Sequence, residues 1–90
     1  MYHEETEEHR KKRIRELAED FPHLPNEAFL RLNDVLALNI VGCSKATLHR
    51  MIKNGRFPPT EKISENIVGI RIGRIKSWQK NPANWEASND

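Results

Sequence analysis

The sequence predicts a small, mainly α-helical domain that carries one β-hairpin. Its 90 residues leave room for one small domain and not for two, since domains typically run to about 100–150 residues. One segment, residues 45–54, has a helix signal at each end. Two short β-prone segments, 61–64 and 67–72, are separated by two residues, as the strands of a hairpin are.

Residues 1–21 predict a charged helical arm that precedes this domain. The segment 3–21 is rich in strong helix formers and contains neither glycine nor proline. Its acids gather at the N-terminal end, where the helix dipole favours them, and Glu7 precedes Lys11 by four residues. Its apolar residues fall only in the last two turns, so we expect the first two turns to project into solvent.

Residues 22–27 contain two prolines and predict a short, stiff linker. The compact domain is expected over 28–80, and it opens with a dense apolar cluster. Asn33 and Asp34 are expected to cap a short helix over about 34–39. Gly42 then supplies a turn.

The helix that follows has the clearest bounds in the sequence. Ser44 stands in the N-cap position before residues 45–54, and Gly55 stands where a helix C′ residue should. The hairpin comes next, and we expect Ile63, Val68 and Ile70 to pack it against the helices.

Gly73 is expected to open a final helix over 74–80, which the Asn81-Pro82 pair ends. The tail, 81–90, has one candidate anchor, Trp85.

This order of helix, turn, capped helix, hairpin and helix is that of a winged helix-turn-helix. In the second helix, Leu48, Met51 and Ile52 can form the buried side. An outward face rich in cations fits the major groove of DNA, although the same pattern also fits a structural helix whose cations are merely hydrated. The outward residues are Lys45, Ala46, His49, Arg50 and Lys53.

Each cation of this helix suits a different contact. Arg50 can donate two hydrogen bonds to O6 and N7 of guanine, whereas Lys53, near the C-terminal end, suits a phosphate. In the hairpin, alternation is expected to turn Lys62 and Arg71 outward, towards the DNA backbone or the minor groove. The alternative is a purely structural hairpin with two hydrated cations.

The distribution of charge points to a polyanion as the partner. The net charge is only +2, but residues 29–80 hold ten bases and three acids, a net charge of +7, between acidic flanks. Phosphate binding draws on Lys and Arg and releases counterions. The alternative is a solvated basic face on an ordinary domain.

Three strings in the domain resemble the AlpA family of prophage regulatory proteins: Phe29-Leu30-Arg31-Leu32, residues 43–48, and residues 52–58, which include Gly55-Arg56-Phe57-Pro58. The resemblance covers roughly residues 29–80. It implies a MerR-like winged helix-turn-helix related to phage excisionases. It also implies a DNA-binding transcriptional regulator, often of an integrase gene. Carried over by position, it assigns Ser44, Lys45, Thr47 and Arg50 to the DNA-facing helix and Lys62 and Arg71 to the wing. Gly73 stands where such proteins commonly have a capping serine.

Other chemistry has little support in the sequence. A single cysteine, Cys43, excludes an internal disulfide and a multi-cysteine zinc site. The four histidines are scattered, and no nucleophile stands with a base, so we expect no metal, no cofactor and no catalysis. No apolar run approaches the ~20 residues of a spanning helix, and the N-terminus is charged where a signal peptide would be apolar. We therefore expect a cytoplasmic protein that does not enter membranes.

The sequence thus predicts a regulator that binds double-stranded DNA of a prophage or other mobile element. One helix-turn-helix buries little DNA-contacting surface, so we expect tandem or symmetric sites, bound by a homodimer or by cooperating copies. An excisionase-like factor that bends DNA is an alternative. A protein-interaction module, which binds through the N-terminal helix or the Trp85 tail, is an alternative of another class.

Overall fold

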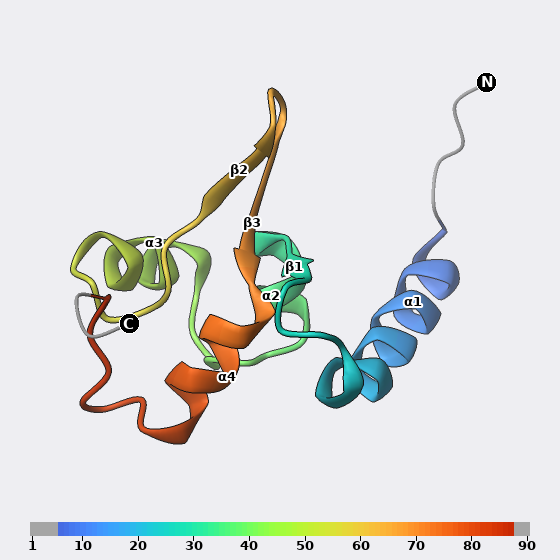
Figure 1. Ribbon diagram of the computed structural model, residues 1–90. Helices are drawn as coiled ribbons and strands as arrows, with labels where there is room; N and C mark the ends of the chain where they lie inside the picture. The colour runs from blue at the N-terminus through green and yellow to red at the C-terminus, as the bar shows by residue number, and fades with distance from the viewer. Residues whose placement is uncertain (1–5, 88–90) are drawn as a thin grey trace.

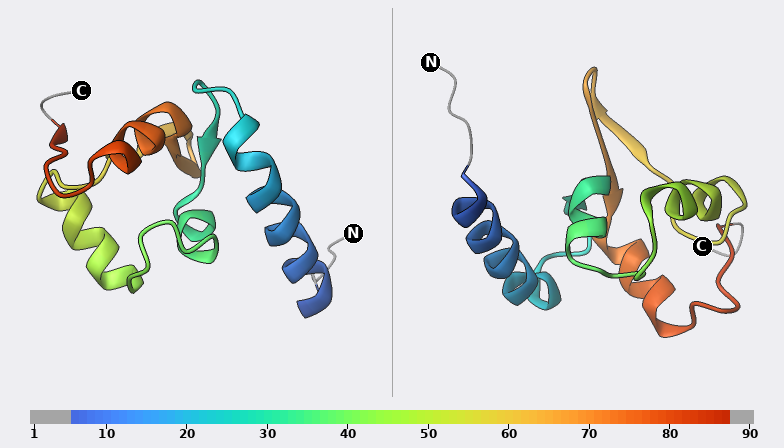
Figure 2. Two further views of the ribbon diagram at one scale, coloured as in Figure 1. Left: turned by 90° about the horizontal axis from the view of Figure 1, so that it is seen from below. Right: turned by 180° about the vertical axis from the view of Figure 1, so that it is seen from behind.

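The computed structural model describes residues 6–87 and shows a three-stranded antiparallel sheet whose base lies among the helices (Figure 1). The predicted fold class, mainly helical with a small β-hairpin, is confirmed, and the arrangement is compatible with a winged helix-turn-helix. The hairpin of β2 and β3 projects from the body, with α3 on one side and α1 on the other (Figures 1 and 2). The elements are α1 (Glu7–Asp20), a 3-10 turn (Phe21–His23), β1 (Phe29–Leu30), α2 (Leu32–Ala37), α3 (Lys45–Lys53), β2 (Glu61–Ser64), β3 (Ile67–Arg71) and α4 (Ile72–Lys80).

The apolar contacts of helix α1 with the body come from its C-terminal part. Thr6 caps it, because the Thr6 hydroxyl accepts a hydrogen bond from the N–H group of His9 at 3.1 Å. Residues 7–13 are exposed, whereas Leu17 and Phe21 pack against the core. The expected projection of the first turns into solvent is confirmed. The expected start of this helix at residue 3 lies outside the described residues.

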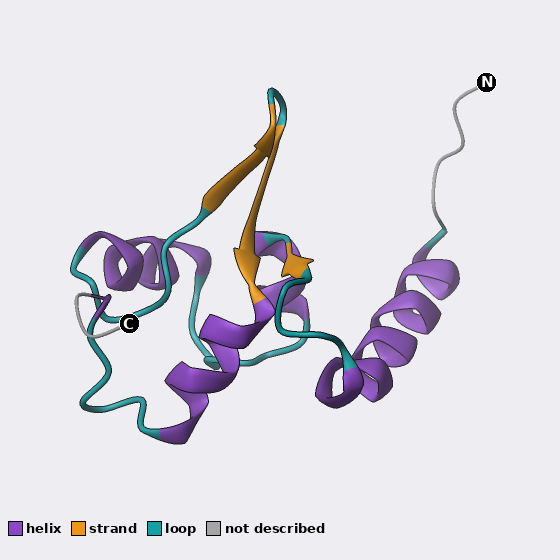
Figure 3. Ribbon diagram, in the orientation of Figure 1, coloured by secondary structure: helices purple, strands orange, loops and turns teal. Residues whose placement is uncertain are grey.

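The sheet has the order β1-β3-β2, so β3 is its central strand (Figure 3). Leu30 of β1 stands opposite Ile70. In the hairpin Lys62 stands opposite Val68, and a bulge follows before Ser64. The hairpin is confirmed, and its strands end within one residue of the predicted bounds. Strand β1 was not predicted, because two residues are too few to show the alternation of polar and apolar side chains that is typical of a strand.

The predicted cap of α2 at Asn33 and Asp34 is wrong. The helix begins at Leu32, and its N-cap is Arg31, which makes no side-chain cap hydrogen bond. The cause is β1, because the chain leaves the sheet in extended form and turns into the helix at once. Asn33 and Asp34 therefore lie inside the first turn.

Helices α2 and α3 end in the same way. One residue beyond each C-cap has a positive φ, namely Asn39 (57°) after α2 and Gly55 (74°) after α3. The N–H group of the next residue then bonds back to a carbonyl oxygen in the helix, at 3.3 Å after α2 and 2.8 Å after α3. These are Schellman motifs, and the predicted role of Gly55 is confirmed.

Helix α4 begins two residues earlier than predicted, directly after β3, and no side chain caps it. Backbone carbonyls of the linker region take the place of a cap. The N–H group of Ile72 donates to the oxygen of Ala28 at 2.8 Å, and that of Gly73 donates to the oxygen of Asn26 at 3.0 Å. A Cβ atom on Gly73 would lie 2.8 Å from the Cβ of Asn26, so the glycine permits this close approach.

The core joins the sheet, α3, α4 and the tail. Phe57 meets Trp78 edge to face, with ring centroids 4.9 Å apart, and the indole N–H of Trp78 donates to the carbonyl oxygen of Arg56 at 2.9 Å. Trp85 is buried as well, and the N–H of Ala87 donates to the oxygen of Gly55 at 3.0 Å. The tail therefore packs against the C-terminal end of α3. The buried hydrophobic residues are Leu30, Val35, Leu48, Phe57, Ile70, Ile72, Ile75, Trp78 and Trp85.

Gly73→Ala is expected to lower the free energy of unfolding by about 1 to 2 kcal/mol, because the new methyl group would overlap the Asn26 backbone region. Gly73 is the second residue of α4, so the preference for alanine in a helix interior offsets little of this loss. Urea denaturation would measure it. Gln79→Ala, an exposed change in the same helix, is the control and should have little effect. A Gly73→Ala protein as stable as the original would contradict this account.

Candidate nucleic-acid interface

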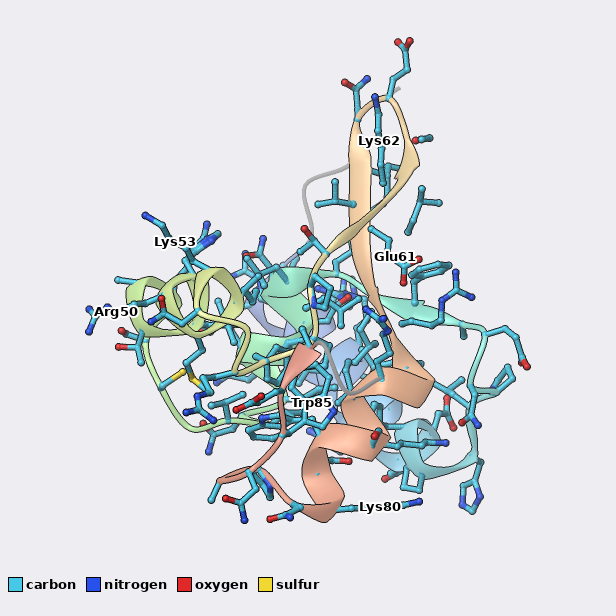
Figure 4. All side chains as sticks on the ribbon, turned by 60° about the vertical axis from the view of Figure 1, so that its left-hand side comes forward. Arg50, Lys53, Glu61, Lys62, Lys80 and Trp85 are labelled. Carbon is cyan, nitrogen blue, oxygen red and sulfur yellow. The ribbon has the colours of Figure 1, made fainter. Side chains whose placement is uncertain are left out.

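Helix α3 presents a cationic face to solvent. Leu48 is fully buried, and Met51 and Ile52 pack against the core. The predicted division of this helix into a buried and an outward side is confirmed. In Figure 4, Arg50 and Lys53 extend away from the body of the domain. The exposed residues are Lys45, Ala46, His49, Arg50 and Lys53.

Two of the residues assigned to this helix by resemblance serve its N-terminus. The hydroxyl of Ser44 accepts a hydrogen bond from the N–H group of Thr47 at 3.2 Å, as its predicted N-cap role requires. The two side-chain hydroxyls are also bonded to each other, at 3.1 Å. Both side chains therefore help to fix where α3 begins.

The cations on the α3 face are not neutralised by neighbouring acids. Within residues 6–87, none of the ion pairs involves Lys45, Arg50 or Lys53. Residues 31–57 contain a single acid, Asp34, and its carboxylate lies 3.4 Å from the guanidinium of Arg13 in α1. The field of this surface is thus dominated by unpaired positive charge.

The wing, which is the hairpin of β2 and β3, places its two predicted cations on opposite faces. Lys62 shares a face with Val68, its partner across the hairpin, whereas Arg71 lies three residues beyond Val68 in the same strand. Lys62 is exposed in the projecting part of the hairpin, as Figure 4 shows.

The expectation that Arg71 points freely outward is wrong. Its guanidinium donates two hydrogen bonds to the carboxylate of Glu61, both at 3.1 Å, and lies over the ring of Phe29, 4.6 Å from the ring centroid. The hydrogen bond from Arg71 lowers the pKa of Glu61 below its ordinary value of 4.5. This pair joins the base of the wing to β1 and leaves Arg71 engaged within the protein.

The expected packing of the hairpin is confirmed only for Ile70. Ile70 is fully buried, but Ile63 is 46% exposed and Val68 is 49% exposed. The two strands extend beyond the helices, so their outer residues are only partly covered (Figure 3). The wing also has no net charge, because residues 61–71 contain two acids and two bases.

A groove of about 300 Å³ separates α3 from the wing. Lys45 and His49 line it from α3, and residues 66–68 line it from the wing. Arg31, the N-cap of α2, also lines it, although no sequence signal predicted a role for this residue. Arg50 and Lys53 do not line this groove, so it does not gather all the predicted site residues of α3.

Comparison with protein-family models matches residues 28–83 to a family described as prophage CP4-57 regulatory protein (AlpA). The chain belongs to the AlpA family. The match extends over more than half of the chain and includes β1, α2, α3, the wing and α4. It leaves out α1 and Trp85. AlpA membership identifies the chain as a phage-related regulatory protein.

No curated protein and no solved structure matches this AlpA-family chain. Among residues 6–87, no helix is both long enough and apolar enough to cross a membrane. The same part of the chain holds no group of three or more His, Cys, Asp or Glu side chains arranged for a metal ion.

Glu61→Gln is expected to remove a stabilising interaction that depends on pH. A carboxylate whose pKa is lowered by folding stabilises the protein above its unfolded pKa, and this contribution is lost as the pH falls through the folded pKa. The difference in unfolding free energy between the original protein and Glu61→Gln should therefore be largest above pH 4.5 and shrink below it. Thermal or urea unfolding across acidic pH would measure this difference. Glu65→Gln, which removes a carboxylate from the same wing, should give no such convergence, and a constant difference for Glu61→Gln would rule out the ion pair.

Proposed function

We propose that this chain binds double-stranded DNA through α3 and the wing and regulates transcription of a prophage or other mobile-element gene, such as an integrase gene. The unpaired cationic face of α3 is the observation that carries this proposal. A surface of this kind attracts phosphates and releases counterions. The single acid of the helix-turn-helix region is already paired with Arg13, so it opposes this attraction little.

In this proposal each cation of α3 has its own contact. Arg50, on the exposed face, enters the major groove and reads a guanine edge, while Lys53 contacts a phosphate. Lys45 and His49 lie nearest the wing, and Ser44 and Thr47 fix the start of the helix. Lys62 is the wing's contact with the DNA backbone, and Arg71 supports the wing from within.

A first experiment would titrate labelled random duplex with the protein at low salt. Binding that weakens steeply as salt rises is expected. The absence of binding would favour the alternative of a protein-interaction module, which would bind through the exposed part of α1, because Trp85 is buried. An excisionase-like factor would use the same interface but bend the duplex, so the bend angle of a bound site separates it from a simple regulator.

Arg50→Ala should weaken binding to the preferred site by about 1 to 3 kcal/mol and flatten the preference at one base position. Selection from a random pool, followed by titration of the selected site, would measure both effects. Lys80→Ala removes an exposed cation from the far end of α4 and is the control (Figure 4). Equal weakening on all sequences would instead assign Arg50 to a phosphate.

Lys53→Ala should lower the slope of log K against log salt by about one unit and leave the base preference unchanged. The reason is that one phosphate contact fewer releases about one counterion fewer. Titration of the selected site and of random duplex between low and moderate salt would give the slopes. An unchanged slope would reject a phosphate contact for Lys53.

A further inference from the structure

The groove between α3 and the wing has the chemistry of a phosphate site. Three cationic or ionisable side chains line it: Arg31 from the start of α2, and Lys45 and His49 from α3. The amides of Asn33 and Asn66 add hydrogen-bond donors, and Val68 forms an apolar wall on the wing side. None of the groove residues is acidic.

The cations of the groove are available to a ligand. Arg31, Lys45 and His49 are exposed. In the described part of the chain none of them takes part in an ion pair. Arg71, by contrast, is held by Glu61. An anion that enters the groove therefore meets the positive charges of Arg31 and Lys45 on the helices, because the wing contributes no net charge.

The geometry of duplex DNA indicates which part of a bound duplex would lie in this groove. A major groove and the minor groove beside it are separated by a single sugar-phosphate strand. If α3 enters the major groove and the projecting wing reaches the adjacent minor groove, that strand must pass between them. The space between them is the groove lined by Arg31 and Val68.

We propose that this groove holds one backbone segment of the bound duplex, with Arg31, Lys45 and His49 around a phosphate and Val68 against a sugar. This inference rests on the proposed function and adds Arg31 to it. It also accounts for the exposure of Val68, because an apolar side chain beside a deoxyribose loses contact with water when the strand enters. Contacts of this kind position the protein and do not read bases.

Arg31→Ala tests the inference in the full chain. Arg31 is exposed and makes no side-chain cap bond, so the variant should remain folded, which circular dichroism and thermal unfolding would verify. Its affinity for random duplex should fall about five- to tenfold at 0.1 M salt, and its salt slope should fall by about one unit. The base preference of the selected site should not change. Arg31→Lys should retain most of the affinity, and Lys80→Ala should match the original protein.

Ethylation interference on the selected site would locate the contact. In the original protein, ethylation of a phosphate between the major-groove and minor-groove segments should block binding. In Arg31→Ala, interference at that phosphate should weaken, while the other phosphates keep their effect. An unchanged slope and an unchanged interference pattern in folded Arg31→Ala would overturn the inference, even if Arg50→Ala still altered base preference. If the original protein bound no duplex at all, the proposed function itself would fail.

Discussion

The antiparallel pairing of β1 with β3 determines how the rest of the domain is arranged. Two residue pairs, Phe29 with Arg71 and Leu30 with Ile70, bring the end of the linker against the strand that leads into α4. The same contact supplies the carbonyl groups that receive the first N–H groups of α4. It also determines where α2 begins, and it gives the base of the wing a third strand. A wing of two strands alone would be marginally stable in water.

The ion pairs of the molecule divide its surface into neutral and cationic regions. Arg13 neutralises Asp34, Arg71 neutralises Glu61, and Arg56 lies 3.6 Å from Glu86 in the tail. The Arg56–Glu86 pair is exposed and contributes little to stability, whereas the Arg71–Glu61 pair is partly buried and has two hydrogen bonds. The effect of these pairs on the electrostatic potential is larger, since Asp34 and Glu86, which lie near the helix-turn-helix, are matched, whereas the cations of α3 are left unmatched.

Local signals in the sequence were enough to predict α3 and the hairpin. Ser44 and Gly55 mark the two ends of α3 by side-chain chemistry and by backbone freedom, and neither signal depends on the rest of the fold. Contacts between distant segments could not be predicted in this way. Strand β1 exists because β3 is beside it, and the early start of α2 and the backbone cap of α4 both follow from that pairing. A periodicity argument does not detect a partner forty residues away.

The burial of residues on the wing could not be predicted from local signals either. Alternation alone does not give the register of the hairpin, which sets Lys62 opposite Val68 on one face, and it does not say whether a helix covers that face. The sequence therefore predicted a buried Ile63 and Val68, whereas the hairpin extends past the helices that would cover them. The hydrogen bonds from Arg71 to Glu61 could not be predicted either, because the two residues are neighbours only across the hairpin. In the candidate site, the residues on one helix could be predicted, and the groove that joins Arg31 to α3 and the wing could not.

The docking of the tail has a consequence for the motions of α3. Ala87 bonds to the carbonyl of Gly55, and Trp85 is buried in the core that also holds Leu48. A helix end that is free in solution frays readily, because opening its last turn exposes few apolar contacts. Here the turn that carries Lys53 leads directly to Gly55, which is hydrogen-bonded to the tail. Fraying of this turn must therefore also disturb the packing of Trp85. The C-terminal turn of α3 and the tail therefore open as one cooperative unit, and the face that carries Arg50 and Lys53 keeps its shape before any partner arrives.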